Sequence, residues 1–310
     1  MSGRSGDPMA PWCSWPNTPP CQGGDRRFES ARGRQPGEVG AGPSWRPAGR
    51  VPPRSAAYHE AVPLHPGAGQ GFTADPRRYQ RGRPGYPDAA IDWALGEAGI
   101  ERGAEVVEMG AGTGKLTSEL MARGPRVIAV EPVAQMAGAL SARLPDLQVL
   151  VATAESTGLA QALPAAQSPH WFALGAAVQK IRRLLRPGGW LVLLWNRRDR
   201  SHPTWQAVAE LVEPLRAEDP TPEGDRWRSA HAVGREFGAV VHRRFAHTVT
   251  AICGGLEDSV LSISNVACQP PEVRRRMRTE PDRIWSRRAP LPGGDRLPYP
   301  TDAYLGRAGA

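Results

Sequence analysis

The sequence predicts an α/β fold in which a doubly wound, mostly parallel sheet carries helices on both faces and follows a disordered N-terminal tail. Between residues 101 and 199, short apolar runs alternate with helical patterns across short turns, as is typical of parallel sheets. A glycine-rich turn joins the first of these runs to a helix. Residues 1–70 contain 12 Pro and 11 Gly but only five Leu, Ile, Val or Phe residues, too few to build a core. We therefore expect the folded part in residues 71–310.

The predicted elements follow the tail in a regular order. Pro84 and Pro87 require extended or turn geometry, and Asp88 is expected to cap a short helix that Gly99 ends. The expected strands of the core are 105–109, 126–131, 147–151 and 190–195, and the expected helices are 115–123, 133–143 and 174–185. Residues 200–250 are polar and irregular, as a lid or substrate insertion would be. Strand-like runs return at 240–249 and 296–304.

Charge and composition exclude several partners. The net charge is +8, carried by 37 Arg and two Lys. We interpret clusters such as Arg274–Arg276 as a solvated helix face, and expect no specific nucleic-acid partner. An apolar stretch of eighteen residues and a secretory h-region are both lacking, so we expect no membrane partner and a cytoplasmic location. The four Cys form no CxxC pair, and no metal site is expected.

The glycine-rich turn fits one of three ligand patterns better than the others. A dinucleotide pattern, GxGxxG, fails because Lys115 stands where the third glycine belongs. A P-loop fails because Gly110 is one residue too close to Gly114 and Leu116 replaces the magnesium-binding hydroxyl. The acidic, three-glycine turn Glu108-x-Gly110-x-Gly112-x-Gly114 of S-adenosylmethionine binding fits without a gap.

From Phe72 to about Tyr304 the chain resembles the class I S-adenosylmethionine-dependent methyltransferases, in particular the small-molecule branch often labelled type 11. The resemblance rests on separated motifs in the expected order, which are Tyr79-x-x-x-Arg83-Pro-x-Tyr-Pro87, Glu108-Met-Gly-Ala-Gly-Thr-Gly114, Val130-Glu-Pro132, Ala154-Glu155, His170-Trp-Phe172, Leu185-Arg-Pro-Gly-Gly189 and Leu297-Pro-Tyr299. It implies a Rossmann-like sheet. It divides the folded part into an N-terminal flap (71–100), a cofactor-binding core (101–199), the insertion (200–250) and a C-terminal part of the sheet (251–310).

The same resemblance implies a cofactor site for S-adenosylmethionine. Glu108 is placed to contact the ammonium of the ligand, and Glu131 to accept hydrogen bonds from both ribose hydroxyls. The residues expected to bind the cofactor are Glu108, Gly110, Ala111, Gly112, Thr113, Gly114, Glu131, Pro132, Ala154 and Glu155. The alternative for each acid is a solvated carboxylate at the sheet edge.

Four residues are candidates for contacting the substrate. Tyr79 and Arg83 belong to the flap that covers cofactor and substrate in the relatives, and Arg83 is suited to pair with a carboxylate. His170 and Trp171 belong to the segment that faces the methyl-transfer cleft, where a histidine orients a substrate or acts as a base. His170 is the single candidate catalytic residue. Packing roles are the alternative for all four.

The region between Glu155 and His170 departs from the family. It is short and contains Pro164 and Pro169, although proline is not tolerated inside a central strand. Either residues 160–166 still form a short strand, or the sheet is interrupted beside the cleft. Two functions therefore stay open: in-line methyl transfer to a small-molecule acceptor, or a degenerate relative that at most binds the cofactor. A P-loop-like nucleotide-binding protein is a distant third.

Overall fold

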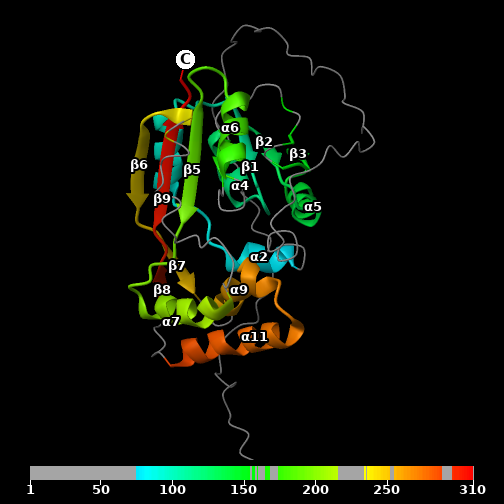
Figure 1. Ribbon diagram of the computed structural model, residues 1–310, viewed down its shortest axis with the longest axis vertical. Coiled ribbons are helices and arrows are strands. Elements are labelled where there is room, and N and C mark those ends of the chain that lie inside the picture. Colours follow the sequence, from blue (N-terminus) through cyan, green and yellow to red (C-terminus); the bar gives the residue numbers. More distant parts are fainter. Residues whose placement is uncertain are drawn as a thin grey trace, which may run out of the picture. The chain divides into compact units, whose positions relative to one another are not determined.

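A seven-stranded sheet provides the framework, with strand order β3-β2-β1-β4-β5-β9-β6 (Figure 1). Its strands are β1 (Glu105–Met109), β2 (Arg126–Val130), β3 (Gln148–Leu150), β4 (Ala165–Gln167), β5 (Trp190–Asn196), β6 (Val240–Phe245) and β9 (Thr301–Arg307). The computed structural model describes residues 75–153, 156–157, 159, 165–167, 174–215, 234, 236–251, 255–287 and 295–309. The predicted tail, residues 1–70, lies outside these ranges.

The five strands from β3 to β5 are parallel, as expected from the alternation of strands and helices. In the middle of the sheet, Val107 of β1 is paired with Ile128 of β2 on one side and with Ala165 of β4 on the other. β9 runs antiparallel to β5, and β6 runs antiparallel to β9. The prediction of a mostly parallel sheet is confirmed.

The fourth strand exists but is only three residues long. β4 pairs with residues 107–109 of β1 and with residues 191–193 of β5, so its backbone is bonded on both sides. It overlaps the expected position, residues 160–166, only at residues 165 and 166. The sheet is therefore continuous across the shortened region.

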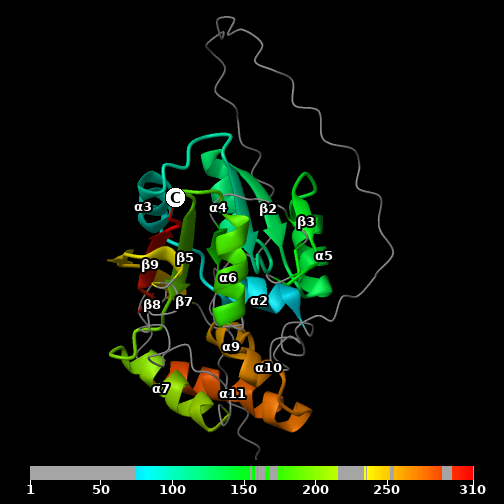
Figure 2. The same cartoon turned by 45° about the horizontal axis from the view of Figure 1, so that its top comes forward.

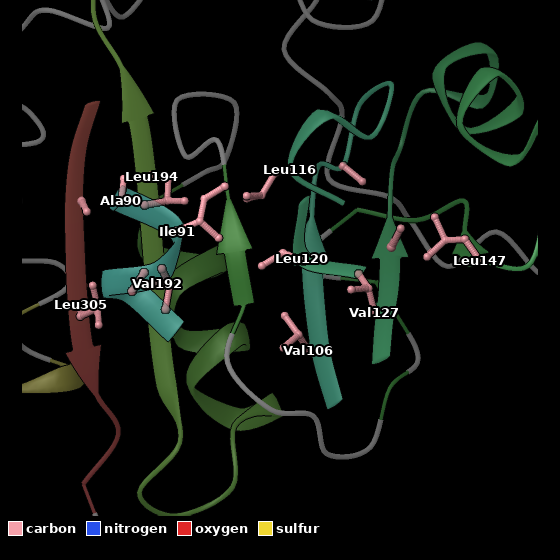
Figure 3. Packing of buried hydrophobic residues seen from close by; sticks show 14 of the residues in the cluster. Ala90, Ile91, Val106, Leu116, Leu120, Val127, Leu147, Val192, Leu194 and Leu305 are labelled. Carbon is pink, nitrogen blue, oxygen red and sulfur yellow. The ribbon is translucent and has the colours of Figure 1, made fainter. Parts of the chain in front are cut away.

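Helices pack on both faces of the sheet. The helices beside the strands are α3 (Asp88–Glu97), α4 (Lys115–Arg123), α5 (Ala134–Arg143) and α6 (Leu174–Leu184). Figure 3 shows one core, where Ile91 of α3 and Leu120 of α4 lie among side chains from the strands. On the other face, Ile181 of α6 packs with Leu191 and Leu193 of β5. Each fully buried aliphatic side chain contributes roughly 1.5–3 kcal/mol to stability.

Two short strands pair outside the main sheet, where the sequence predicted longer ones. The run 240–249 divides into β6 and β7 (Thr248–Ala251), and the run 296–304 divides into β8 (Asp295–Pro298) and β9. β7 and β8 pair with each other, and the backbone N–H of Tyr299 donates to the carbonyl oxygen of His247 at 2.7 Å. The chain changes sheets at both places, which an apolar pattern alone does not show.

The flap contains a helix that was not predicted from the sequence, α2 (Pro76–Gly82). The Asp75 side chain caps it by accepting the backbone N–H of Arg78 at 2.9 Å, and Pro76 occupies its first position. Asp88, expected as a cap, is instead the first residue of α3, and Pro87 is the N-cap. The Asp88 carboxylate accepts from Arg123 of α4 at 2.5 Å.

A second helical group lies beyond the carboxyl ends of the parallel strands (Figure 2). It comprises α7 (Pro203–Val212), followed by the 3₁₀ turn Glu213–Leu215, and α9 (Gly255–Leu261), α10 (Ser264–Ala267) and α11 (Pro271–Ser286). Trp205, Val260 and Met277 pack in its core. The expected boundary at residue 250 thus does not separate lid from sheet, because helices from both 200–250 and 251–310 build this group. No helix among the described residues is long and apolar enough to cross a membrane.

Candidate cofactor and substrate site

The loop between β1 and α4 takes a conformation that requires glycine. Gly110, Gly112 and Gly114 have φ angles of 67°, 58° and 82°, in the left-handed region that side chains disfavour. A Cβ atom on Gly114 would overlap Leu140 Cδ1 and lie 2.8 Å from Arg143 Nη2. The glycines therefore let the backbone turn tightly from the buried strand β1 into α4.

Glu131, directly after β2, ties this loop to the neighbouring strand. Its carboxylate accepts the backbone N–H of Gly112 at 2.8 Å and that of Val133 at 2.9 Å. Burial raises the pKa of Glu131, and the two backbone hydrogen bonds oppose that rise. Glu131 thus holds the glycine loop in place. Each of its oxygens keeps a lone pair for a further donor.

A cavity opens where the glycine loop, the flap and the carboxyl end of β5 meet. Its lining is formed by Tyr79, Arg83, Pro84, Tyr86, Glu108, Met109, Gly110, Ala111, Gly112, Thr113, Lys115, Leu116, Leu194, Trp195, Asn196 and Tyr299. Of the predicted site residues, the structure brings together Glu108, Gly110, Ala111, Gly112, Thr113, Tyr79 and Arg83. Gly114, Glu131 and Pro132 are not among the lining residues but lie on the adjacent turns, where Glu131 is bonded to the lining residue Gly112. Ala154, Glu155, His170 and Trp171 lie outside the described residues.

Glu108 is the acid of this cavity, and it is 4% exposed. Its Oε2 atom has no hydrogen-bond partner among the residues that the structure describes. Burial raises the pKa of Glu108 to about 8, opposed by the nearby Thr117 hydroxyl and the Arg143 cation and reinforced by Glu131. A buried carboxyl group in this state is suited to bind a cation, because a cation supplies the missing partner and favours the ionised form.

The flap supplies an aromatic ring and a cation to the same cavity. The Arg83 guanidinium carbon lies 5.5 Å from the centre of the Tyr79 ring. Arg83 Nη2 donates to the Ser262 carbonyl oxygen at 2.9 Å, whereas its buried Nε finds no acceptor within the described part of the chain. Burial raises the pKa of Tyr79, which Glu131 reinforces and Arg83 opposes. Arg83 is thus held in place, with one N–H still available to a ligand.

Several residues of the site were not predicted from the sequence. Asn196, the last residue of β5, donates from Nδ2 to the Gly85 carbonyl oxygen at 2.7 Å and accepts from Thr301 Oγ1 at 2.5 Å. It therefore joins the flap to the sheet. Lys115, Trp195 and Tyr299 also line the cavity. The signal was available, because ligands of parallel sheets bind beyond the carboxyl ends of the strands, where β5 ends.

The arrangement of α4 disfavours a P-loop. Leu116 lines the cavity at the position where a P-loop needs a metal-binding hydroxyl. The next hydroxyl, on Thr117, is fully buried and is not part of the cavity lining. Burial also lowers the pKa of Lys115, and Arg143 adds to that effect. The loop therefore lacks the hydroxyl that would hold a magnesium ion.

Comparison with known proteins agrees with this geometry. Residues 107–193 match the model of a methyltransferase domain family. Over 200 residues, covering 63% of this chain and 77% of each relative, it is 36% identical to uncharacterized methyltransferases of Mycobacterium tuberculosis and Mycobacterium bovis. It is 29% identical over 218 residues to an uncharacterized methyltransferase-like protein of Schizosaccharomyces pombe, covering 69% of this chain and 85% of that protein.

A solved structure shows the same fold. It is that of a candidate type II methyltransferase from Anaeromyxobacter dehalogenans, with a TM-score of 0.50 and 24% identity, covering 73% of this chain and 97% of the other.

Proposed function

The chain belongs to the class I S-adenosylmethionine-dependent methyltransferase family, and on that premise we propose that it binds S-adenosylmethionine and methylates a small-molecule acceptor. The observation that carries the proposal is the unpartnered, buried Oε2 of Glu108 in the cavity under the glycine loop. A buried polar atom without a partner costs roughly 1–3 kcal/mol. A ligand with a cationic group at this position would remove that cost.

The residues present fit both ends of the cofactor. Glu108 would hold its ammonium group, and the Nε of Arg83 would hold its carboxylate. The glycine loop leaves room for the methionine part to lie close to the backbone. Glu131 would accept from the ribose hydroxyls with the lone pairs that Gly112 and Val133 do not use.

When bound, S-adenosylmethionine supplies a methyl group activated by the positive charge on its sulfur. The chain's own contribution is then to position the two reactants and to exclude water, which are large effects in reactions of this kind. The aromatic residues Tyr79, Tyr86, Trp195 and Tyr299 contribute to the cavity lining. Lys115 is a second cation in the lining, which favours an acceptor that carries a carboxylate or a hydroxyl group.

Calorimetric titration tests the cofactor assignment. We expect S-adenosylmethionine to bind and ATP with magnesium not to bind. Glu131→Ala should weaken S-adenosylmethionine binding by about 1–3 kcal/mol, because a charged acceptor of several hydrogen bonds is lost. Glu105→Ala is the control, since that carboxylate is exposed and pairs with Arg126 at the start of the sheet. ATP binding that depends on Lys115 would instead establish a nucleotide-binding P-loop.

Turnover is tested separately from binding. The protein is incubated with S-adenosylmethionine and a panel of small carboxylic and hydroxylated acceptors, and released S-adenosylhomocysteine is measured. Release that requires an acceptor supports the proposed activity. Binding without release on the whole panel would leave the protein as a cofactor-binding relative without methyl transfer.

A further inference from the structure

The helix α2 lies between the glycine loop and the helical group beyond the sheet. Both Figure 1 and Figure 2 show it beside α9, although about 180 residues of sequence separate the two helices. On its other side, Gln80 of α2 accepts a hydrogen bond from the Thr113 hydroxyl of the glycine loop. The residues on and after this helix, Tyr79 and Arg83, line the cavity.

One acid of α9 holds α2 from the side of the helical group. Asp258 accepts from Arg78 Nε at 3.3 Å, from Arg81 Nε at 2.6 Å and from Arg81 Nη2 at 3.2 Å. The Asp258 side chain is only 18% exposed, against 58% for Arg81. A largely buried acid that binds two arginines from one helix fixes that helix more firmly than an isolated surface ion pair does.

The backbone of the two helices is in direct contact at the same place. A Cβ atom on Gly82 would overlap the carbonyl group of Asp258 and lie 2.8 Å from the backbone nitrogen of Ser259. One residue further along, Arg83 Nη2 donates to the carbonyl oxygen of Ser262, just after α9. Contacts to α9 therefore flank Tyr79 at Arg78 and Arg81, and Arg83 is itself bonded to the residue that follows α9.

We propose that Asp258 is a positioning residue for the cofactor site: through Arg78 and Arg81 it sets the position of α2, and so places Tyr79 and Arg83 over the amino-acid end of S-adenosylmethionine. The inference rests on the proposed function. It assigns to α9 a role in binding the cofactor although α9 itself supplies no lining residue of the cavity among those described. The adenosine end, which Glu131 and the glycine loop would hold, should depend less on this contact, although Gln80 of α2 accepts a hydrogen bond from Thr113 of that loop.

Two ligands that differ only in the amino-acid end test the proposal. S-adenosylhomocysteine carries that end, and 5′-methylthioadenosine lacks it. Asp258→Asn keeps the size of the side chain but removes its charge, and should weaken S-adenosylhomocysteine binding roughly three- to tenfold while changing 5′-methylthioadenosine binding less than about twofold. Gly82→Ala should give the same pattern, because its methyl group displaces α2 from α9. Glu257→Gln is the matched control, since Glu257 is the neighbouring acid of α9 and makes none of the three hydrogen bonds that Asp258 accepts from α2.

A double-mutant cycle shows whether Asp258 acts through the flap. In an Arg83→Met background, Asp258→Asn should have a smaller further effect on S-adenosylhomocysteine binding than in wild type, because only Tyr79 of the two side chains that it positions remains. Unchanged binding in Asp258→Asn, or equal loss for both ligands together with a lower melting temperature, would overturn the inference while leaving the proposed function intact. Wild-type protein that binds neither ligand would overturn the proposed function, and this inference with it.

Discussion

Glu108 and Arg83 each present a buried polar atom without a partner among the described residues, and both line the same cavity. One is an acid on the strand β1, and the other is a base on the flap. Placing both without partners lowers stability, since each such atom costs roughly 1–3 kcal/mol. An acid and a cation in the lining of one cavity match a zwitterionic ligand, and an amino acid is such a group.

The raised pKa of Glu108 predicts how the stability of the ligand-free protein depends on pH. Its pKa is about 8 in the folded protein against an ordinary value of 4.5, so between these values the folded protein keeps a proton that the unfolded chain has released. The contribution of Glu108 to stability should therefore fall as pH rises from about 5 to about 8, by at most about 1.4 kcal/mol per pH unit. Urea unfolding of wild-type protein and of Glu108→Gln at several pH values measures this.

The variant should have the smaller slope, although not a zero one. Glu131 is also buried with a raised pKa, and it contributes to the wild-type slope in the same direction. Equal slopes in the two proteins would show that Glu108 is already ionised in the folded state. In that case the Glu108 carboxylate would be charged and hydrated before the cofactor binds, and binding would have to displace that water.

At the scale of elements, the alternating strands and helices of the parallel half of the sheet were predicted best from the sequence. The strand 105–109 and the helix 115–123 have the expected bounds, because an apolar strand, a glycine turn and an amphipathic helix are all visible locally. The helix α2 was missed, because seven residues with one buried position show no helical period. Its one local signal was the pair Asp75-Pro76, a helix cap followed by a proline.

The short strand β4 makes a measurable prediction about the sheet. Its backbone pairs on both sides, whereas the equally short β3 lies at the edge of the sheet and pairs only with β2 among the described strands. Amide hydrogen exchange should therefore be slower in residues 165–167 than in residues 148–150, since exchange at a central strand requires wider opening. Exchange at 165–167 as fast as in an unstructured peptide would mean that the sheet is interrupted beside the cavity.

For the whole molecule, the order of elements was predictable and their assembly was not. The glycine loop with Glu108 and Glu131 followed from sequence spacing, because the sequence directly encodes the end of each strand. Asn196 and Asp258 did not, because their partners Gly85 and Arg81 are more than 100 residues away. Contacts of that range depend on how the flap and the helices fold back, which no local pattern shows.

At the scale of the whole molecule, we predict that the N-terminal tail is dispensable for folding. Residues 1–70 have too few apolar side chains to form a core, so a chain that begins at Phe72 is expected to fold as the full-length protein does. Its melting temperature and its affinity for S-adenosylmethionine should match those of the full chain within error. A clear loss of either would show that the tail contributes to the folded domain.

The close contact at Gly82 limits which sequence changes the protein can accept during evolution. A side chain at that position would overlap the backbone of α9. The flap and the helical group can therefore approach this closely only because residue 82 is glycine. A chimera that takes its helical group from one relative and its flap from another will pack well only where both parents share this spacing. The two segments are far apart in the sequence, yet a change in one is tolerated only where the other leaves room for it.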